Sequence, residues 1–303
     1  MQLLDPRNFS EYELIDSGNY KKLERFGSII TSRPEPQAIW DCSLSENEWS
    51  KLAHATFKKE KQHDLAGERG EWVLKNGVEN NWYINYKHEG LNINFRLGFS
   101  SFKHVGIFPE QASNWDYIYS NVSKMKSVEK RVLNLFAYTG GASLAAKAAK
   151  ADIVHVDSIK QVVSWARANM ESSKLTDIRW VIEDAMKFVK REAKRGKLYQ
   201  GIMLDPPSYG HGAAGEKWVI EEHLKEMLMT CKEILDPKEH FFILNLYSTG
   251  FSSLVIETLL NSIFSKPKEL EIGSLYLEDR CAKKLPMGNY GRFSNIMTIR
   301  SLV

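Results

Sequence analysis

The chain has 303 residues, enough for two domains with separate hydrophobic cores. Its 43% hydrophobic and 26% charged residues are ordinary for a globular protein, and its net charge of +3 permits a nucleic-acid partner without requiring one. The three cysteines are scattered without a metal-ligand spacing, so we expect no metal site and a reducing, cytoplasmic location. Neither a secretory signal nor an apolar run of about 20 residues is visible, so we expect no membrane association.

Residues 1–102 are predicted to form a small β-rich domain. Four segments carry strand-like patterns separated by turn residues, namely 12–18, 27–40, 71–76 and 81–98. Within this region, only residues 46–62 have a helical pattern.

Residues 103–303 are predicted to form a second domain in which strands and helices alternate. The expected strands are 131–138, 153–157, 178–184, 199–205, 240–248, 270–280 and 294–303. The expected helices are 110–124, 141–151, 161–173, 185–196, 218–235 and 251–264. Alternation of this kind predicts an α/β fold with a doubly wound, mainly parallel sheet, and the apolar strands indicate that both faces are covered.

Ligands bind such sheets beyond the carboxyl ends of the strands, so the residues after each strand are the candidate site. After the first strand, Gly140 and Gly141 permit a close backbone approach at the start of a helix. The dinucleotide fingerprint G-x-G-x-x-G is absent, because Phe136 and Tyr138 occupy positions where it requires glycine. The alternative interpretation is a plain tight turn between strand and helix.

The second and third strands end in acidic residues. Asp157 follows the glycine turn at about the 20-residue spacing of a ribose-binding acid, although an aspartate here can also cap a helix. Glu183 or Asp184 can accept a hydrogen bond from an adenine amino group while the N–H of Ala185 faces a ring nitrogen. For this pair, a helix cap is the simpler interpretation of the segment alone.

The fourth strand ends in Asp205, Pro206 and Pro207, followed closely by Tyr209. Two prolines fix the backbone after the acid, and Tyr209 can lie over a flat substrate group. The alternative is an ordinary proline-rich turn. Together, the four strand ends describe a ligand with a ribose and an adenine but no pyrophosphate, and S-adenosylmethionine fits.

At these residues the sequence resembles class I S-adenosylmethionine-dependent methyltransferases with a Rossmann-like sheet. More narrowly, it resembles the bacterial 23S ribosomal RNA (large-subunit) methyltransferase family that makes 5-methylcytosine and 7-methylguanine. The resemblance covers roughly residues 103–300 and depends on "LNLFAYTGGASLAA", "VDSIKQVVSWARANM", "EDAMKFVKR" and "LDPPSYG".

The resemblance implies site residues of three kinds. The cofactor-binding residues are Asn134, Phe136, Tyr138, Thr139, Gly140, Gly141, Asp157, Ser158, Glu183, Asp184, Ala185 and Asp205. The upstream "GIFPEQASNW" adds Phe108, Glu110 and Gln111, which would hold the methionine end of the cofactor. The catalytic residues are Asp205, Pro206, Pro207 and Tyr209, and residues 285–293 are expected to form a C-terminal loop before the last strand.

Methylation of cytosine C5 requires a cysteine nucleophile after the fifth strand, where this chain has Ser248. We therefore expect transfer to a ring or exocyclic nitrogen of an RNA base, with ribosomal RNA favoured. A ring nitrogen such as guanine N7 needs no base, whereas an exocyclic amine would lose a proton to Asp205 or, as a second choice, His211. A methyltransferase for a small molecule or protein side chain, and a non-catalytic RNA- or nucleotide-binding module, remain alternatives.

Two basic runs, residues 187–197 and 124–131, can contact RNA phosphates. Their simpler interpretation is a solvated helix surface. The sequence leaves the oligomeric state undetermined.

Overall fold

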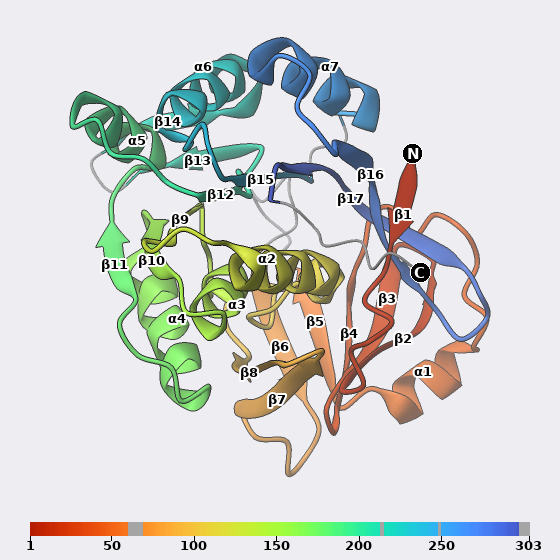
Figure 1. The fold of residues 1–303 in the computed structure, drawn as a ribbon. Helices are drawn as coiled ribbons and strands as arrows, with labels where there is room; N and C mark the ends of the chain where they lie inside the picture. Colours follow the sequence, from red (N-terminus) through yellow and green to blue (C-terminus); the bar gives the residue numbers. More distant parts are fainter. Residues whose placement is uncertain (60–68, 213–214, 248–249, 297–303) are drawn as a thin grey trace, which may run out of the picture. The chain divides into compact units, whose positions relative to one another are not determined.

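The computed structural model describes residues 1–59, 69–212, 215–247 and 250–296 (Figure 1). By compactness the described chain forms two units. The α/β unit contains residues 1–4 and 113–275 together with the described residues from Gly288 onward, and the β-rich unit contains residues 5–112 and 276–287. A division between residues 102 and 103 stays a prediction.

The described part of the α/β unit is built on one long sheet. Its strand order is β1 (Gln2–Leu4), β16 (Glu271–Glu278), β17 (Lys284–Ser294), β15 (Phe241–Leu246), β12 (Gly201–Leu204), β9 (Arg131–Leu135), β10 (Asp152–Asp157) and β11 (Arg179–Ile182). The pairs from β15 through β11 are all parallel, whereas β17 is antiparallel to β15. The predicted mainly parallel, doubly wound sheet is confirmed.

Helices cover both faces of this sheet (Figure 1). On one side lie α5 (Ala185–Lys194), α6 (Ile220–Ile234) and α7 (Ser253–Phe264), and on the other lie α2 (Ala112–Lys124), α3 (Gly141–Ala148) and α4 (Lys160–Ser172). Side chains from α5, α6 and α7 form one buried cluster with Leu133, Leu135, Ile202 and Leu244 of the central strands. Burial on both faces explains why these strands are apolar throughout.

The β-rich unit contains a second sheet, a two-stranded ribbon and a short helix. The sheet order is β2 (Tyr12–Gly18), β3 (Lys21–Phe26), β4 (Ile29–Pro34), β5 (Ala55–Lys59) and β6 (Gly70–Leu74). The ribbon pairs β7 (Asn81–His88) with β8 (Leu91–Gly98), the helix is α1 (Glu46–Leu52), and a 3-10 turn, η1, spans Pro109–Gln111. The predicted β-rich N-terminal region is confirmed.

The predicted helix over residues 46–62 is wrong after Leu52. Helix α1 starts with a capping box between Ser45 and Glu48, but Ala53 is extended and β5 follows at once. Ala55 and Phe57 are buried alternately along β5, which pairs with β4 and β6. Pairing within the sheet therefore overrides the helical composition of this segment, and residues 60–62 lie outside the described part.

Residues 285–293 were expected to form a loop, but they belong to β17, which pairs with β15 from Ser294 back to Asn289. Strand β3 was not predicted from the sequence, because its Lys22 and Glu24 are residue types typical of the surface. In the structure both are buried, and Lys22 lies 3.7 Å from Glu24 and 3.2 Å from Glu35. Charged residues can occupy an inner strand when they are paired in this way.

Candidate active site

The candidate site lies where the strand order reverses. From β9 the chain moves outward to β10 and β11, and it then returns to β12 on the opposite side of β9. Leu135 and Leu204 are opposite each other in these adjacent parallel strands, and the Asp205 N–H donates to the Leu135 carbonyl at 3.4 Å. The switch point therefore brings the glycine turn and the Asp-Pro-Pro segment together, in the position where open α/β sheets bind ligands.

The turn after β9 has an unusual backbone. Phe136 and Tyr138 have φ values of 55° and 49°, and Gly140 has a φ of 92°. Left-handed conformations cost a residue with a side chain roughly 1–2 kcal/mol. The two aromatic residues thus adopt conformations that favour glycine, and strain of this kind concentrates at ligand sites. Glycine is needed at position 141, because a Cβ there would lie 2.8 Å from the ring of Trp115.

Asp157 at the end of β10 stabilises this turn. Its Oδ2 accepts the N–H of Tyr138 at 2.9 Å, and its Oδ1 accepts the N–H of Ile159 at 3.0 Å. The N-cap residue of α4 is Ile159 and not Asp157, so the helix-cap interpretation of Asp157 is wrong. Burial raises the pKa of the Asp157 carboxyl. The Ser158 N–H also donates to this carboxylate, which retains acceptor capacity for a ligand hydroxyl.

The two acids after β11 have different local partners. Asp184 caps α5 by accepting the N–H of Lys187 at 2.9 Å, so the cap interpretation is confirmed for this residue. Glu183 forms an ion pair with Arg191, and its N–H donates to the Asp157 carbonyl at 3.2 Å. The ends of β10 and β11 are thereby joined, and Ala185 begins the helix next to them.

The Asp-Pro-Pro segment leads into a hairpin of β13 (Tyr209–His211) and β14 (Lys217–Val219). The Tyr209 side chain is 54% exposed, whereas Trp218 of β14 is buried. The Trp218 indole N–H donates to the Pro207 carbonyl at 2.7 Å, and its ring centroid lies 4.9 Å from that of Phe136. Trp218 therefore connects the proline corner with the glycine turn.

Trp218 is a site residue that the sequence did not predict, because it falls in the first turn of the helix expected over residues 218–235. The helix α6 instead begins at Ile220. A strand of three residues is too short to show an alternating pattern, and the glycines around it indicate only a loop.

Hydrogen bonds among buried polar side chains hold the turn in place. The Asn134 side chain donates to Ser143 Oγ at 2.9 Å, and Ser143 Oγ lies 3.0 Å from His155 Nδ1. In addition, the Asn169 side-chain amide donates to the Thr139 carbonyl at 2.9 Å. Burial lowers the pKa of His155 to about 3, so its imidazole is neutral at physiological pH. These contacts fix the two predicted site residues Asn134 and Thr139.

Not every predicted residue belongs to this unit. Phe108, Glu110 and Gln111 are in the β-rich unit, and their role toward the cofactor stays a prediction. Ser248 and the side chain of His211 lie outside the described part of the chain. Within the described residues, no cluster of three His, Cys, Asp or Glu side chains could hold a metal ion. No helix in that part is long and apolar enough to cross a membrane.

The basic run at 187–197 is largely ion-paired. Its pairs are Lys187 with Glu216, Lys190 with Glu226, Arg191 with Glu183 and Arg195 with Glu192. This arrangement favours the helix-surface interpretation over phosphate binding.

A doubly wound sheet with a strained turn, a half-buried acid after the next strand and a rigid acidic corner at the switch point defines a Rossmann-like methyltransferase. The model of the S-adenosylmethionine-dependent methyltransferase family matches residues 50–261, well over half of the sequence. The chain belongs to this family and is an S-adenosylmethionine-dependent enzyme.

A crystal structure of an S-adenosylmethionine-dependent methyltransferase from Agrobacterium tumefaciens is similar over almost the whole chain. It is 34% identical, with a TM-score of 0.88, over 97% of this chain and 93% of that one. Ribosomal RNA large subunit methyltransferase K/L of Pseudoalteromonas translucida is 29% identical over 154 residues, which are 49% of this chain and 21% of that protein. Ribosomal RNA large subunit methyltransferase I of Photobacterium profundum is 31% identical over 111 residues, or 36% and 28% of the two chains. The matches thus span less than a third of these two curated relatives.

Proposed function

We propose that this enzyme transfers a methyl group from S-adenosylmethionine to a nitrogen atom of a base in ribosomal RNA. The observation that carries the proposal is the corner at Asp205 and Pro207, which leads to the exposed Tyr209 and which Trp218 connects to the strained turn at Phe136. The names of the two ribosomal RNA methyltransferases similar to this chain support the choice of substrate.

The residues of the switch point fit the adenosine part of the cofactor. The half-buried Asp157 has acceptor capacity for a ribose hydroxyl, and its hydrogen bond with the Tyr138 N–H holds the turn toward it. Glu183 lies at the end of the next strand, where it can accept from the adenine amino group. Phe136 and Tyr138 stand where the pyrophosphate-binding fingerprint G-x-G-x-x-G requires glycine, so the turn lacks the spaced glycines of that fingerprint.

The acceptor base is positioned by the chain itself. The bound cofactor supplies an electrophilic methyl group on a positively charged sulfur. Asp205 and its carbonyl, held by the following prolines, orient the acceptor nitrogen, and transfer requires that atom about 3–3.5 Å from the methyl carbon. Stacking on Tyr209 contributes about 1–3 kcal/mol to holding a base that has left its helix.

The protonation of the acceptor decides whether Asp205 also acts as a base. A ring nitrogen with a free lone pair, such as guanine N7, has no proton to lose. An exocyclic amine would release a proton, and Asp205 is the acid residue at the corner that would accept it.

The experiment is nucleoside mass spectrometry of ribosomal RNA from a strain that lacks this chain. The strain is complemented with the wild-type protein, with Asp205→Ala, or with Asp152→Ala as a control at the opposite, amino-terminal end of a sheet strand. We expect one methylated nucleoside to disappear and to return with the wild type and the control but not with Asp205→Ala. An unchanged nucleoside profile contradicts the RNA substrate and redirects the search to small molecules and proteins.

A further inference from the structure

The β-rich unit contains a cavity of about 530 Å³. It lies among α1, the turn between β2 and β3, the end of β4, and β5. The aromatic and positively charged residues that line it are Tyr20, Lys21, Arg33, Trp49, Phe57 and Lys59. Small-molecule pockets have volumes of roughly 300–1,000 Å³, so a single nucleotide fits this space.

Tyr20 at this cavity has a conformation that a tyrosine rarely adopts. It forms the two-residue turn between β2 and β3 together with Asn19, and the φ values are 49° for Asn19 and 61° for Tyr20. Glycine is the favoured residue at the second position of such a turn. The Tyr20 side chain is also 63% exposed, so burial does not compensate for the strain. A strained and exposed aromatic residue beside a cavity indicates a ligand contact.

Two lysines supply positive charge beside this ring. Lys21 Nζ lies 4.8 Å from the Trp49 ring centroid and 3.8 Å from Glu46 Oε1. The Glu46 side chain is 92% exposed, so their ion pair contributes at most about 1 kcal/mol, and a phosphate can replace it. Lys59 at the end of β5 is exposed. Arg33 does not add to this charge, because it is paired with the buried Glu24 at 2.5 Å.

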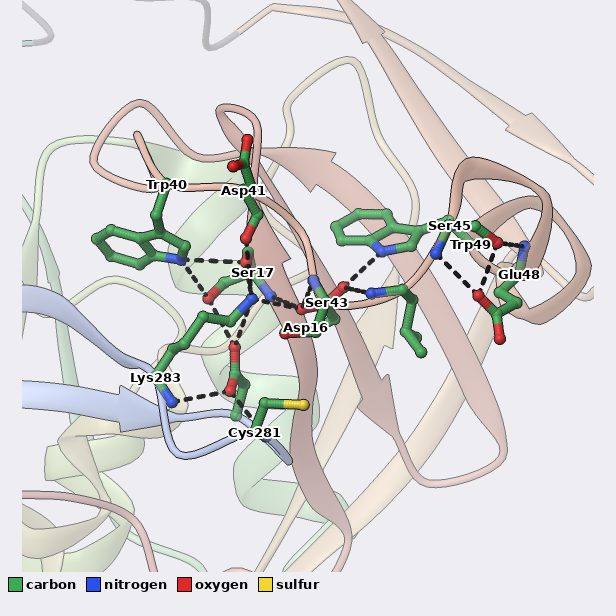
Figure 2. A network of polar contacts seen from close by, with 12 residues as sticks. Asp16, Ser17, Trp40, Asp41, Ser43, Ser45, Glu48, Trp49, Cys281 and Lys283 are labelled. Carbon is green, nitrogen blue, oxygen red and sulfur yellow. Dashed lines mark hydrogen bonds and ion pairs between the residues drawn. The ribbon is translucent and has the colours of Figure 1, made fainter.

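The wall of the cavity is fixed. Trp49 is buried, and its indole N–H donates to Asp16 Oδ2 at 2.8 Å (Figure 2). Lys21 is therefore held over a rigid aromatic surface, which reduces the entropy lost when it binds an anion.

We propose that this cavity binds one unstacked nucleotide of the RNA substrate. The base stacks on Tyr20, and Lys21 and Lys59 contact the neighbouring phosphates. An aromatic platform beside cations is the arrangement that binds single-stranded nucleic acid without reading its sequence. The inference rests on the proposed function, since it takes RNA as the substrate.

The test measures binding of a fluorescent single-stranded ribosomal RNA fragment to the full chain, together with the melting temperature. Tyr20→Gly removes the ring and relieves the backbone strain, so we expect RNA affinity to fall at least about fivefold while the melting temperature rises. Tyr20→Phe should retain wild-type affinity. Tyr83→Ala is the control, because Tyr83 is 61% exposed in the same unit and does not line the cavity.

Lys21→Ala and Lys59→Ala should each remove one phosphate contact, which lowers the slope of log affinity against log salt concentration by about 1. Lys58→Ala should leave this slope unchanged. Lys58 is exposed on the same strand but does not line the cavity. If the wild type binds RNA and Tyr20→Gly binds it equally well, the cavity is not the site, and the proposed function stands. A wild type that neither binds nor methylates RNA overturns both. Preference for free nucleoside monophosphate over the RNA fragment overturns the assignment of the nucleotide to RNA.

Discussion

The ammonium of Lys283 lies 2.8 Å from Oδ1 of Asp16, although the two residues are 267 positions apart in the sequence (Figure 2). Asp16 also accepts the backbone N–H groups of Ser43 and Leu44. Lys283 donates to the carbonyl oxygens of Ser17 and Asp41 as well. This network ties the late segment 276–287 to strand β2, so the β-rich unit needs two distant parts of the chain.

Replacement of Lys283 by methionine should destabilise the β-rich unit by about 3 kcal/mol. The Asp16 side chain is 1% exposed, and loss of the ammonium leaves a buried carboxylate without its cationic partner. Chemical denaturation of the two proteins measures this difference. The matched control is Lys284→Met, since Lys284 is 52% exposed and 4.0 Å from Glu278. It should change stability by less than about 0.5 kcal/mol, and equal losses in the two variants would contradict the role of Lys283.

Replacement of Glu110 by glutamine should stabilise the protein at pH 8. Glu110 is buried, its Oε1 has no hydrogen-bond partner, and burial raises the pKa of its carboxyl. A raised pKa in the folded state means that wild-type stability falls as the pH rises from the unfolded value of 4.5 through the folded one. The variant lacks this loss, so its melting temperature should exceed that of the wild type at pH 8, and the difference should shrink toward pH 4.5.

The control for this effect is Glu79→Gln at an exposed position. It should leave the difference from the wild type constant over the same pH range. Because Glu110 is also predicted to hold the methionine end of the cofactor, calorimetry should show weaker binding of S-adenosylmethionine to Glu110→Gln. If Glu110→Gln is more stable than the wild type at pH 8 but binds S-adenosylmethionine equally well, Glu110 does not hold the cofactor. Its effect on stability would still be that of a buried carboxylate.

His155 should make the α/β unit sensitive to moderate acid. Its pKa is lowered from 6.5 to about 3 by burial, so between these values the unfolded chain binds a proton that the folded chain does not. Stability is therefore lost as the pH falls below 6.5, by up to about 1.4 kcal/mol per pH unit. Urea unfolding of the wild type and His155→Gln at pH 7, 6 and 5 measures this loss. The variant should show a smaller decrease, whereas parallel decreases would show that His155 is not responsible.

The sequence predicted the α/β fold and the alternation of its strands and helices because periodicity and strand-end residues are local signals. Gly140, Asp157 and Asp205 each follow an apolar run, and their meeting at one edge follows from parallel pairing. Long-range pairing was not visible. Lys22 and Glu24 look like surface residues until Glu35 and Arg33 lie beside them. The hairpin that carries Trp218 was likewise not predicted, because each of its three-residue strands is recognised only by its pairing with the other.

Replacement of Trp218 by phenylalanine should slow methyl transfer about five- to tenfold without weakening cofactor binding. Phenylalanine preserves the ring beside Phe136 but loses the 2.7 Å hydrogen bond to the Pro207 carbonyl. One such bond contributes about 1 kcal/mol, and here its loss loosens the corner that holds the acceptor. The measurements are calorimetric binding of S-adenosylhomocysteine and the initial rate of labelled methyl transfer to ribosomal RNA from the deletion strain.

A matched control separates this effect from a general loss of stability. Trp82→Phe removes an equivalent bond, since the Trp82 indole donates to the Phe26 carbonyl at 3.1 Å in the β-rich unit. If Trp218 positions the corner, kcat falls in Trp218→Phe alone, while S-adenosylhomocysteine binds both variants as it binds the wild type. If both variants lose the same activity, or if Trp218→Phe loses cofactor affinity instead, the bond to Pro207 does not position the acceptor.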